Sequence, residues 1–193
     1  LQIPIVDKAG KYILTVTLNA NGCMAKDSVI VLKDTIPPAD VAAEVSGPLD
    51  CNITTVILSG SSSNPDAQYF WTSPNGFNSP DAFALTNMPG EYTLTATDPL
   101  NGCSDTAMVT VYLDDAAPLC DIIEPTSAPV AMGTNVISAV QVSDVSYLWN
   151  ITSTNTNWTV LSGADSPELT YHAGDAGTTG TIVLTVTNNG NGC

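Results

Sequence analysis

Positive charge is what this chain has least of. Its 193 residues include four Lys or Arg and one His against 19 Asp or Glu, a formal net charge of −15. Nucleic-acid binding needs clustered cations that neutralise phosphates, and binding to an anionic membrane surface needs a basic segment. The composition therefore excludes nucleic acid as a partner. The acidic excess fits either plain solvation or the binding of cations.

Long apolar runs and helical patterns are also missing. No run reaches the roughly 18 apolar residues of a membrane span, so we expect no membrane insertion. The opening residues lack the basic-then-apolar pattern of a secretion signal. Val and Thr instead alternate in short runs cut by Gly, Pro and Asn, which is typical of strands and turns. Hydrophobic residues make up 44% of the chain, enough for a packed core.

Residues that could carry catalysis are scarce. His172 is the only histidine, so no Ser-His-Asp or Cys-His set has a second candidate base. The four Glu are scattered and do not suggest the paired carboxylates of a glycosidase. Neither a phosphate-binding glycine loop nor an HExxH motif is present. We therefore expect no enzymatic activity and no cofactor, with calcium as the one ion to consider.

A repeated segment organises the chain. GKYILTVTLNANGC, GEYTLTATDPLNGC and GTIVLTVTNNGNGC begin at Gly10, Gly90 and Gly180, so their starts are 80 and 90 residues apart. In the middle copy Tyr92, Leu94 and Ala96 alternate with Thr93, Thr95 and Thr97, as in a strand with one buried face. A period of this length corresponds to a whole small β-domain.

Further strands are expected before each hairpin. Trp71 and Trp149 occupy the place where immunoglobulin-like domains bury a Trp. The predicted strands cover residues 41–45, 54–58, 68–72 and 83–85 before the second copy, and 136–140, 146–149 and 169–171 before the third. The sequence therefore predicts an all-β chain of tandem immunoglobulin-like β-sandwich domains.

Two linkers mark the expected domain boundaries. VLKDTIPPAD and VYLDDAAPLCD each follow a final strand and carry Asp and then Pro, which stops a strand. Residues 1–36 then hold the last strands of a preceding repeat, 37–116 a complete sandwich, and 117–193 a second sandwich without its last strand. We accordingly expect the chain to be a fragment of a longer protein.

Several strings resemble a known family. LDCNITTVILSGSSS, YFWTSPNGF, PGEYTLTATDPLNGC and VTVYLDD resemble the Ig-like and PKD-like tandem repeats of giant Bacteroidetes cell-surface proteins, including gliding-motility adhesins and other type IX-secreted proteins. SYLWNITSTN and GTIVLTVTNNGNGC resemble a sister subtype. The resemblance covers nearly the whole chain and implies an extracellular or cell-surface location. It also implies a stalk or spacer with a share in adhesion or gliding motility.

The partners implied are further repeats of the same chain and an extracellular glycan or protein surface. Two alternatives remain open, a carbohydrate- or protein-binding module and an accessory domain of a secreted enzyme. Phe77 and Trp158 are the candidate aromatics for a sugar-binding platform. The resemblance further implies O-glycosylation at Asp-(Ser/Thr)-apolar triplets, although such triplets also arise by chance in a Thr-rich acidic chain. Their acceptors are Ser28, Thr35 and Thr106.

Five cysteines without a CxxC pair favour disulfides over zinc. The simplest pairings are Cys51–Cys103 and Cys120–Cys193, one per domain, which leaves Cys23 to a missing partner. In an immunoglobulin-like order, however, Cys51 and Cys103 lie at opposite poles, and a disulfide needs Cα atoms within about 7 Å. The alternative joins Cys51 to Cys120 or Cys193 of the next domain.

Acidic residues near the linkers suggest a calcium site. Calcium takes six to eight oxygen ligands, and Asp often supplies them where domains join. The competing interpretation is that Asp and Pro cap strands and keep the linkers hydrated. The candidate ligands are Asp34, Asp98, Asp114, Asp115 and Asp121.

Overall fold

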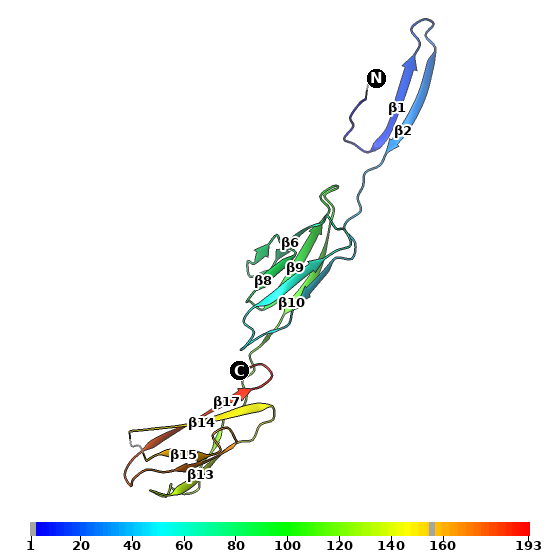
Figure 1. Cartoon of the computed structure of the whole chain (residues 1–193). Coiled ribbons are helices and arrows are strands. Elements are labelled where there is room, and N and C mark those ends of the chain that lie inside the picture. The colour runs from blue at the N-terminus through cyan, green and yellow to red at the C-terminus, as the bar shows by residue number, and fades with distance from the viewer. Residues whose placement is uncertain (1–2, 155–156) are drawn as a thin grey trace. The chain divides into compact units, whose positions relative to one another are not determined.

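The regular secondary structure of the described residues consists of β-strands (Figure 1). The computed structural model describes residues 3–154 and 157–193. The first two residues of the expected segment 1–36, and residues 155–156 of the expected domain 117–193, therefore lie outside it. Within the described residues, no helix with the length and hydropathy of a membrane span occurs.

The chain divides into two compact units. One consists of Leu1–Ala43, Gly60–Ala82 and Thr93–Met108, and the other of Glu44–Ser59, Phe83–Tyr92 and Val109–Cys193. This division does not follow the linkers at 36 and 116. The domain boundaries expected from the sequence therefore stay predictions.

An antiparallel hairpin opens the first unit. It consists of β1 (Gly10–Thr17) and β2 (Met24–Val31), with Gly10 opposite Val31 and Thr17 opposite Met24. The hairpin forms a two-stranded sheet of its own. Its first strand and its turn are the first copy of the repeated segment, Gly10–Cys23, and β2 follows directly after that copy.

Two sheets carry the strand order of an immunoglobulin-like sandwich. One is ordered β3-β5-β8, with bounds Ala42–Val45, Val56–Ser61 and Phe83–Thr86. The other is ordered β10-β9-β6-β7, with bounds Ser104–Val111, Gly90–Thr97, Gln68–Thr72 and Asn78–Ser79. These are the A-B-E and G-F-C-C′ orders of the fold. A short parallel pair, β4 (Leu49–Asp50) with β11 (Leu113–Asp114), is added to them.

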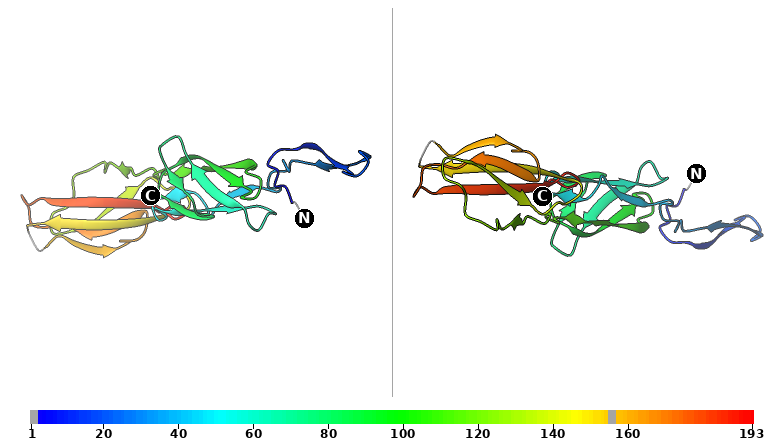
Figure 2. Two further views of the ribbon diagram at one scale, coloured as in Figure 1. Left: turned by 90° about the horizontal axis from the view of Figure 1, so that it is seen from above. Right: turned by 90° about the horizontal axis from the view of Figure 1, so that it is seen from below.

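The C-terminal strands form a second set of the same type. One sheet is ordered β12-β13-β16-β15, with bounds Ile122–Ile123, Thr134–Ala139, Glu168–His172 and Thr159–Ser162. The other consists of β14 (Val145–Ser153) and β17 (Gly180–Asn188), which lie side by side in both views of Figure 2 and pair from Val145–Asn188 to Ser153–Gly180. The orders A-B-E-D and C-F again belong to the immunoglobulin-like fold.

Burial follows the period-two pattern of the sequence. On β9, the side chains of Tyr92, Leu94 and Ala96 are fully buried, and the Thr residues between them are partly exposed. Trp71 is also 0% exposed, and it lies opposite Leu94 in the β6–β9 pairing. The predicted burial of this Trp is confirmed.

The second core gathers around Trp149, which is 3% exposed. Its indole Nε1 donates to the carbonyl oxygen of Ser166 at 2.8 Å. The predicted core role of Trp149 is confirmed. The other buried members of this cluster are Ala139, Leu169, Tyr171, Ala173, Leu184 and Val186.

The long strands are where the sequence places them, and the short ones were missed. The strand expected at 68–72 coincides with β6, and the strand expected at 54–58 is shifted to Val56–Ser61. Strands β4, β7 and β12 have two residues each, too few for an alternating pattern to be visible. The missed pair β4–β11 lies next to the candidate site.

The two buried Trp differ in one hydrogen bond, which predicts different costs of substitution. Among the described residues Trp71 Nε1 has no hydrogen-bond partner, whereas Trp149 Nε1 bonds Ser166. Both Trp→Phe changes shrink the core, but W149F also leaves a carbonyl unpaired, which costs about 1–3 kcal/mol. Hydrogen exchange should show a larger loss of amide protection in β14 for W149F than in β6 for W71F. Equal losses in the two variants would contradict this account.

Candidate functional site: a disulfide-linked turn

Three Asn-Gly-Cys turns share one geometry. In the last of them the Asn188 amide donates to the Cys193 carbonyl at 2.8 Å, and the Gly192 amide donates to the Asn188 carbonyl at 2.8 Å. The same two bonds close the turns that end at Cys23 and Cys103, at 2.8 and 2.9 Å in each. In all three the Gly adopts a φ of 73–74°, a left-handed conformation that favours glycine.

The Asn side chain fixes each cysteine. Its Oδ1 accepts the backbone N–H of the cysteine two residues on, at 3.0 Å for Asn21, 2.7 Å for Asn101 and 3.1 Å for Asn191. This side-chain bond to a nearby amide is the usual role of Asn in turns. The cysteine Cα is therefore presented in the same way in each copy.

Asn101 and Asn191 also donate hydrogen bonds to the two linkers predicted from the sequence. Asn101 Nδ2 donates to the carbonyl of Ile36 at 2.9 Å, and Asn191 Nδ2 donates to the carbonyl of Ala116 at 3.1 Å. Ile36 and Ala116 are equivalent positions, each two residues after the linker Asp. The repeat therefore includes the contact between the turn and the linker as well as the strands.

Asn191 has the most bonds of the three. Its side chain is 3% exposed and donates a further bond to Asp114 Oδ1 at 2.9 Å. Its backbone carbonyl accepts the N–H of Cys51 at 3.1 Å. Sequence reasoning missed this residue, although the recurrence of Asn two residues before each cysteine was a signal for it.

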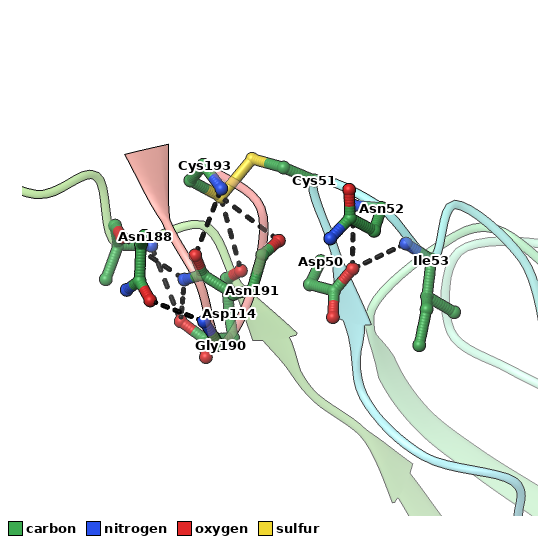
Figure 3. The surroundings of a disulfide bond; sticks show 10 residues. Asp50, Cys51, Asn52, Ile53, Asp114, Asn188, Gly190, Asn191 and Cys193 are labelled. Carbon is green, nitrogen blue, oxygen red and sulfur yellow. Dashed lines mark hydrogen bonds between the residues drawn. A yellow bond between two sulfur atoms is a disulfide. The ribbon is translucent and has the colours of Figure 1, made fainter. Parts of the chain in front are cut away.

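The loop that carries Cys51 is held by β4 and by Asp50. Leu49 is buried and donates its N–H to the Tyr112 carbonyl at 2.8 Å, next to the parallel β4–β11 pairing. Asp50 Oδ1 accepts the amides of Asn52, at 2.8 Å, and Ile53. The carboxylate thus fixes the turn from which Cys51 projects (Figure 3).

A disulfide joins this loop to the last turn. Cys51 and Cys193 are bonded with their Cα atoms 5.1 Å apart, at a sequence separation of 142 (Figure 3). The backbones approach closely, because a Cβ at Gly192 would lie 2.2 Å from Asn52 Nδ2. Glycine is therefore required here for space as well as for its φ.

This bond corrects the predicted pairings. The within-domain pairs Cys51–Cys103 and Cys120–Cys193 are wrong, and the alternative Cys51–Cys193 is the one formed. The loop before β5 meets the turn after β17, where the Asn191 carbonyl also accepts the Cys51 amide. The remaining three cysteines are free thiols, and Cys120 donates its S–H to the Leu184 carbonyl at 3.7 Å.

Two of the candidate calcium ligands, Asp34 and Asp98, cap turns. The carboxylate of Asp34 accepts the Ile36 amide at 3.0 Å, and that of Asp98 accepts the Leu100 amide at 2.8 Å. Asp114 Oδ1 accepts a hydrogen bond from Asn191 Nδ2. The side chains of Asp115 and Asp121 are exposed. Within residues 3–154 and 157–193, no three His, Cys, Asp or Glu gather as a metal site. Calcium binding stays a prediction.

The predicted glycosylation acceptors are exposed. Ser28 lies on β2, Thr35 in the first linker and Thr106 on β10. The preceding Asp accepts the backbone N–H of Ser28 and of Thr106, both at 2.8 Å. The positions are accessible to a transferase, and their modification stays a prediction.

Trp158 is packed into its own sandwich. Its ring stacks on Tyr171 with centroids 6.1 Å apart and planes 11° apart, and its Nε1 donates to Thr178 Oγ1 at 3.0 Å. The backbone of Gly174 and Gly180 is so close that a Cβ on either would clash with the indole. Burial raises the pKa of the Tyr171 hydroxyl. The arrangement favours packing over a sugar-binding platform.

The remaining candidates lie apart from the disulfide turn. His172 donates its Nδ1–H to the Asn157 carbonyl at 3.1 Å. Phe77 lies in the turn between β6 and β7 and is partly exposed.

Comparison with known proteins finds similarity in fold only. No family model matches the chain, and neither does any curated protein. One chain in the crystal structure of a mouse coronavirus receptor-binding domain complexed with its murine receptor is similar at 13% identity, covering 77% of this chain and 92% of that one, with a TM-score of 0.35. Extracellular domains 3–5 of Drosophila OTK match at 14% identity over 93% of this chain and 66% of that one, with a TM-score of 0.32. The FN1–FN3 domains of chicken CNTN1 match at 10% identity over 94% of this chain and 73% of that one, with a TM-score of 0.30.

The chain is an immunoglobulin-like β-sandwich protein. This assignment follows from the strand orders of its sheets, which are A-B-E with G-F-C-C′ and A-B-E-D with C-F.

The Asn191 network predicts a specific loss of stability. Asn191→Ala removes both bonds to the linker and the bond to Cys193, and leaves the Ala116 carbonyl without its amide donor. We expect a loss of about 1–3 kcal/mol, seen as faster hydrogen exchange in β17 and at residues 51–53. Asn21→Ala is the matched control, because the same triplet there is exposed, and its effect should stay within about 0.5 kcal/mol. Equal effects of the two variants would contradict the role assigned to Asn191.

Proposed function

We propose that this chain is a non-catalytic spacer segment made of tandem immunoglobulin-like repeats, part of a larger adhesin outside the cell or on its surface. One observation carries the proposal. A disulfide links Cys51, in the loop before β5, to Cys193, in the turn after β17. In the division that we propose, these two segments belong to successive repeats. A protein that spans a distance and bears tension benefits from such a bond, because it removes the enclosed residues from the path of the force.

The N-terminal hairpin supports the repeat organisation. On β9 the side chain of Leu94 is 0% exposed, whereas Leu14, at the matching place on β1, is 64% exposed. The two hairpins have the same sequence pattern and the same turn. We infer that β1 and β2 are the last two strands of a repeat, and that other strands of that repeat cover Leu14 in the intact protein. Residues 1–36, 37–116 and 117–193 are then three successive repeats.

Cysteine chemistry supports the location. Disulfides persist in oxidising compartments, which include secreted and cell-surface proteins. The formal charge of −15 favours solubility and self-repulsion there. The exposed acceptors Ser28, Thr35 and Thr106 are consistent with glycosylation in the same compartment. Gliding motility and type IX secretion belong to this proposal through the resemblance of the repeats alone.

Pulling single molecules tests the spacer function directly. When force is applied through the two chain ends, an intact Cys51–Cys193 bond keeps 142 residues from extending. At about 3.5 Å per residue, reduction should lengthen the fully extended chain by about 500 Å. Cys51→Ser should give the long form without reductant, and Cys120→Ser, the control, should give the short form. A chain of equal extension before and after reduction would refute the proposal.

A binding module is the competing function. It predicts that this chain alone binds a glycan or a protein surface saturably. The spacer function predicts no saturable binding on a glycan array that includes the sugars of the protein's own surroundings. Trp158→Ala and Phe77→Ala are the variants to compare, because loss of glycan binding in either would establish the competing function.

A further inference from the structure

The turn that ends at Cys103 has the geometry of the turn whose cysteine is bonded. Its backbone closes through the same two hydrogen bonds, and Asn101 holds the Cys103 amide and the linker at Ile36 as Asn191 holds Cys193 and Ala116. The φ of Gly102 is 73° and that of Gly192 is 74°. The thiol of Cys103 is therefore presented like that of Cys193, yet it is free.

The turn that ends at Cys103 is uncovered at Gly102, whereas the turn that ends at Cys193 is covered at Gly192. A Cβ at Gly192 would meet three side-chain atoms of Asn52 at 2.2–2.3 Å, because the Cys51 loop lies on it. A Cβ at Gly102 would meet nothing within 4 Å, although its backbone has the same conformation. The turn at Cys103 thus has room for a loop of the kind that carries Cys51.

We propose that Cys103 forms a disulfide with a cysteine in another immunoglobulin-like repeat, the repeat that ends in β1 and β2. The partner cysteine lies in the loop before the second strand of that repeat, as Cys51 does, and follows a short strand held by a carboxylate-capped turn. This inference rests on the proposed function, because it takes residues 1–36 as the end of a preceding repeat.

The direction of the link follows from the bond that is formed. In the proposed division, Cys51 belongs to the repeat at 37–116 and Cys193 to the following one. The bond between them then takes its turn from the later repeat and its loop from the earlier one. At the preceding junction between repeats, the turn that contributes the cysteine is the one ending at Cys103. The loop that contributes the other cysteine then belongs to the repeat that ends in β2. Cys51 is not the partner, because it is already bonded to Cys193.

The chemistry is an oxidation of two thiols. The Cys103 thiol and its partner lose two protons and two electrons as the S–S bond forms. A dithiol–disulfide oxidant of the exported compartment accepts them and is reduced to its dithiol. Successive repeats would then be linked by a series of disulfides, one at each junction.

Counting free thiols in the natural, full polypeptide tests the proposal. If Cys103 is bonded, Cys103→Ser releases its partner and raises the count by one. If Cys103 is free, the same change lowers the count by one. In the isolated 193-residue chain, where Cys103 is free, the variant should lower the count by one. Cys193→Ser is the positive control, because it releases Cys51 and should raise the count in both proteins.

Peptide mapping without reduction identifies the partner in the unsubstituted polypeptide. We expect Cys103 linked to a peptide from the loop before the second strand of the preceding repeat. Cys103 recovered alkylated, or linked to Cys23 or Cys120, would overturn the inference while leaving Cys51–Cys193 and the spacer function intact. If Cys193→Ser lowers the count instead, the proposed function fails as well, so the two failures are distinguishable.

Discussion

The rest of the structure at the candidate site depends on how closely two backbones approach at Cys51 and Cys193. A disulfide forms only when the Cα atoms lie within about 7 Å, and here they are 5.1 Å apart. Asn191 holds the turn and accepts the Cys51 amide, and Gly192 leaves space for Asn52. The closed loop of 142 residues loses unfolded-state entropy worth on the order of 5 kcal/mol in the chain-entropy model.

The two sets of sheets share the A, B, C, E and F strands and differ in the others, since among the described residues only the first set has a G strand, β10. In the first, the short strand β7 extends the sheet that contains β6, at the C′ position. In the second, β15 is placed beside β16, at the D position. The shared elements are the buried Trp on the third strand and the Asn-Gly-Cys turn after the F strand. Retention of the turn in both variants is consistent with a role in linking repeats, because the fold itself does not require a cysteine there.

The sequence predicted much of the fold because the long strands carry their own periodicity. Tyr92, Leu94 and Ala96 alternate with Thr, and this pattern fixes both the strand and its buried face. The short β4 has no such pattern, and its pairing with β11 depends on contacts more than 60 residues away. The disulfide could not be assigned for the same reason, since cysteine spacing does not determine connectivity. Asn191 was missed because an Asn in a turn is usually exposed, and its burial depends on the linker that it grips.

The central claim is the pairing of Cys51 with Cys193, and one measurement tests it most directly. The 193-residue chain is alkylated under native conditions, digested without reduction and analysed by mass spectrometry. The account predicts one linked species containing Cys51 and Cys193, with alkylated Cys23, Cys103 and Cys120. Recovery of Cys51 linked to Cys103, or of Cys120 linked to Cys193, would contradict it.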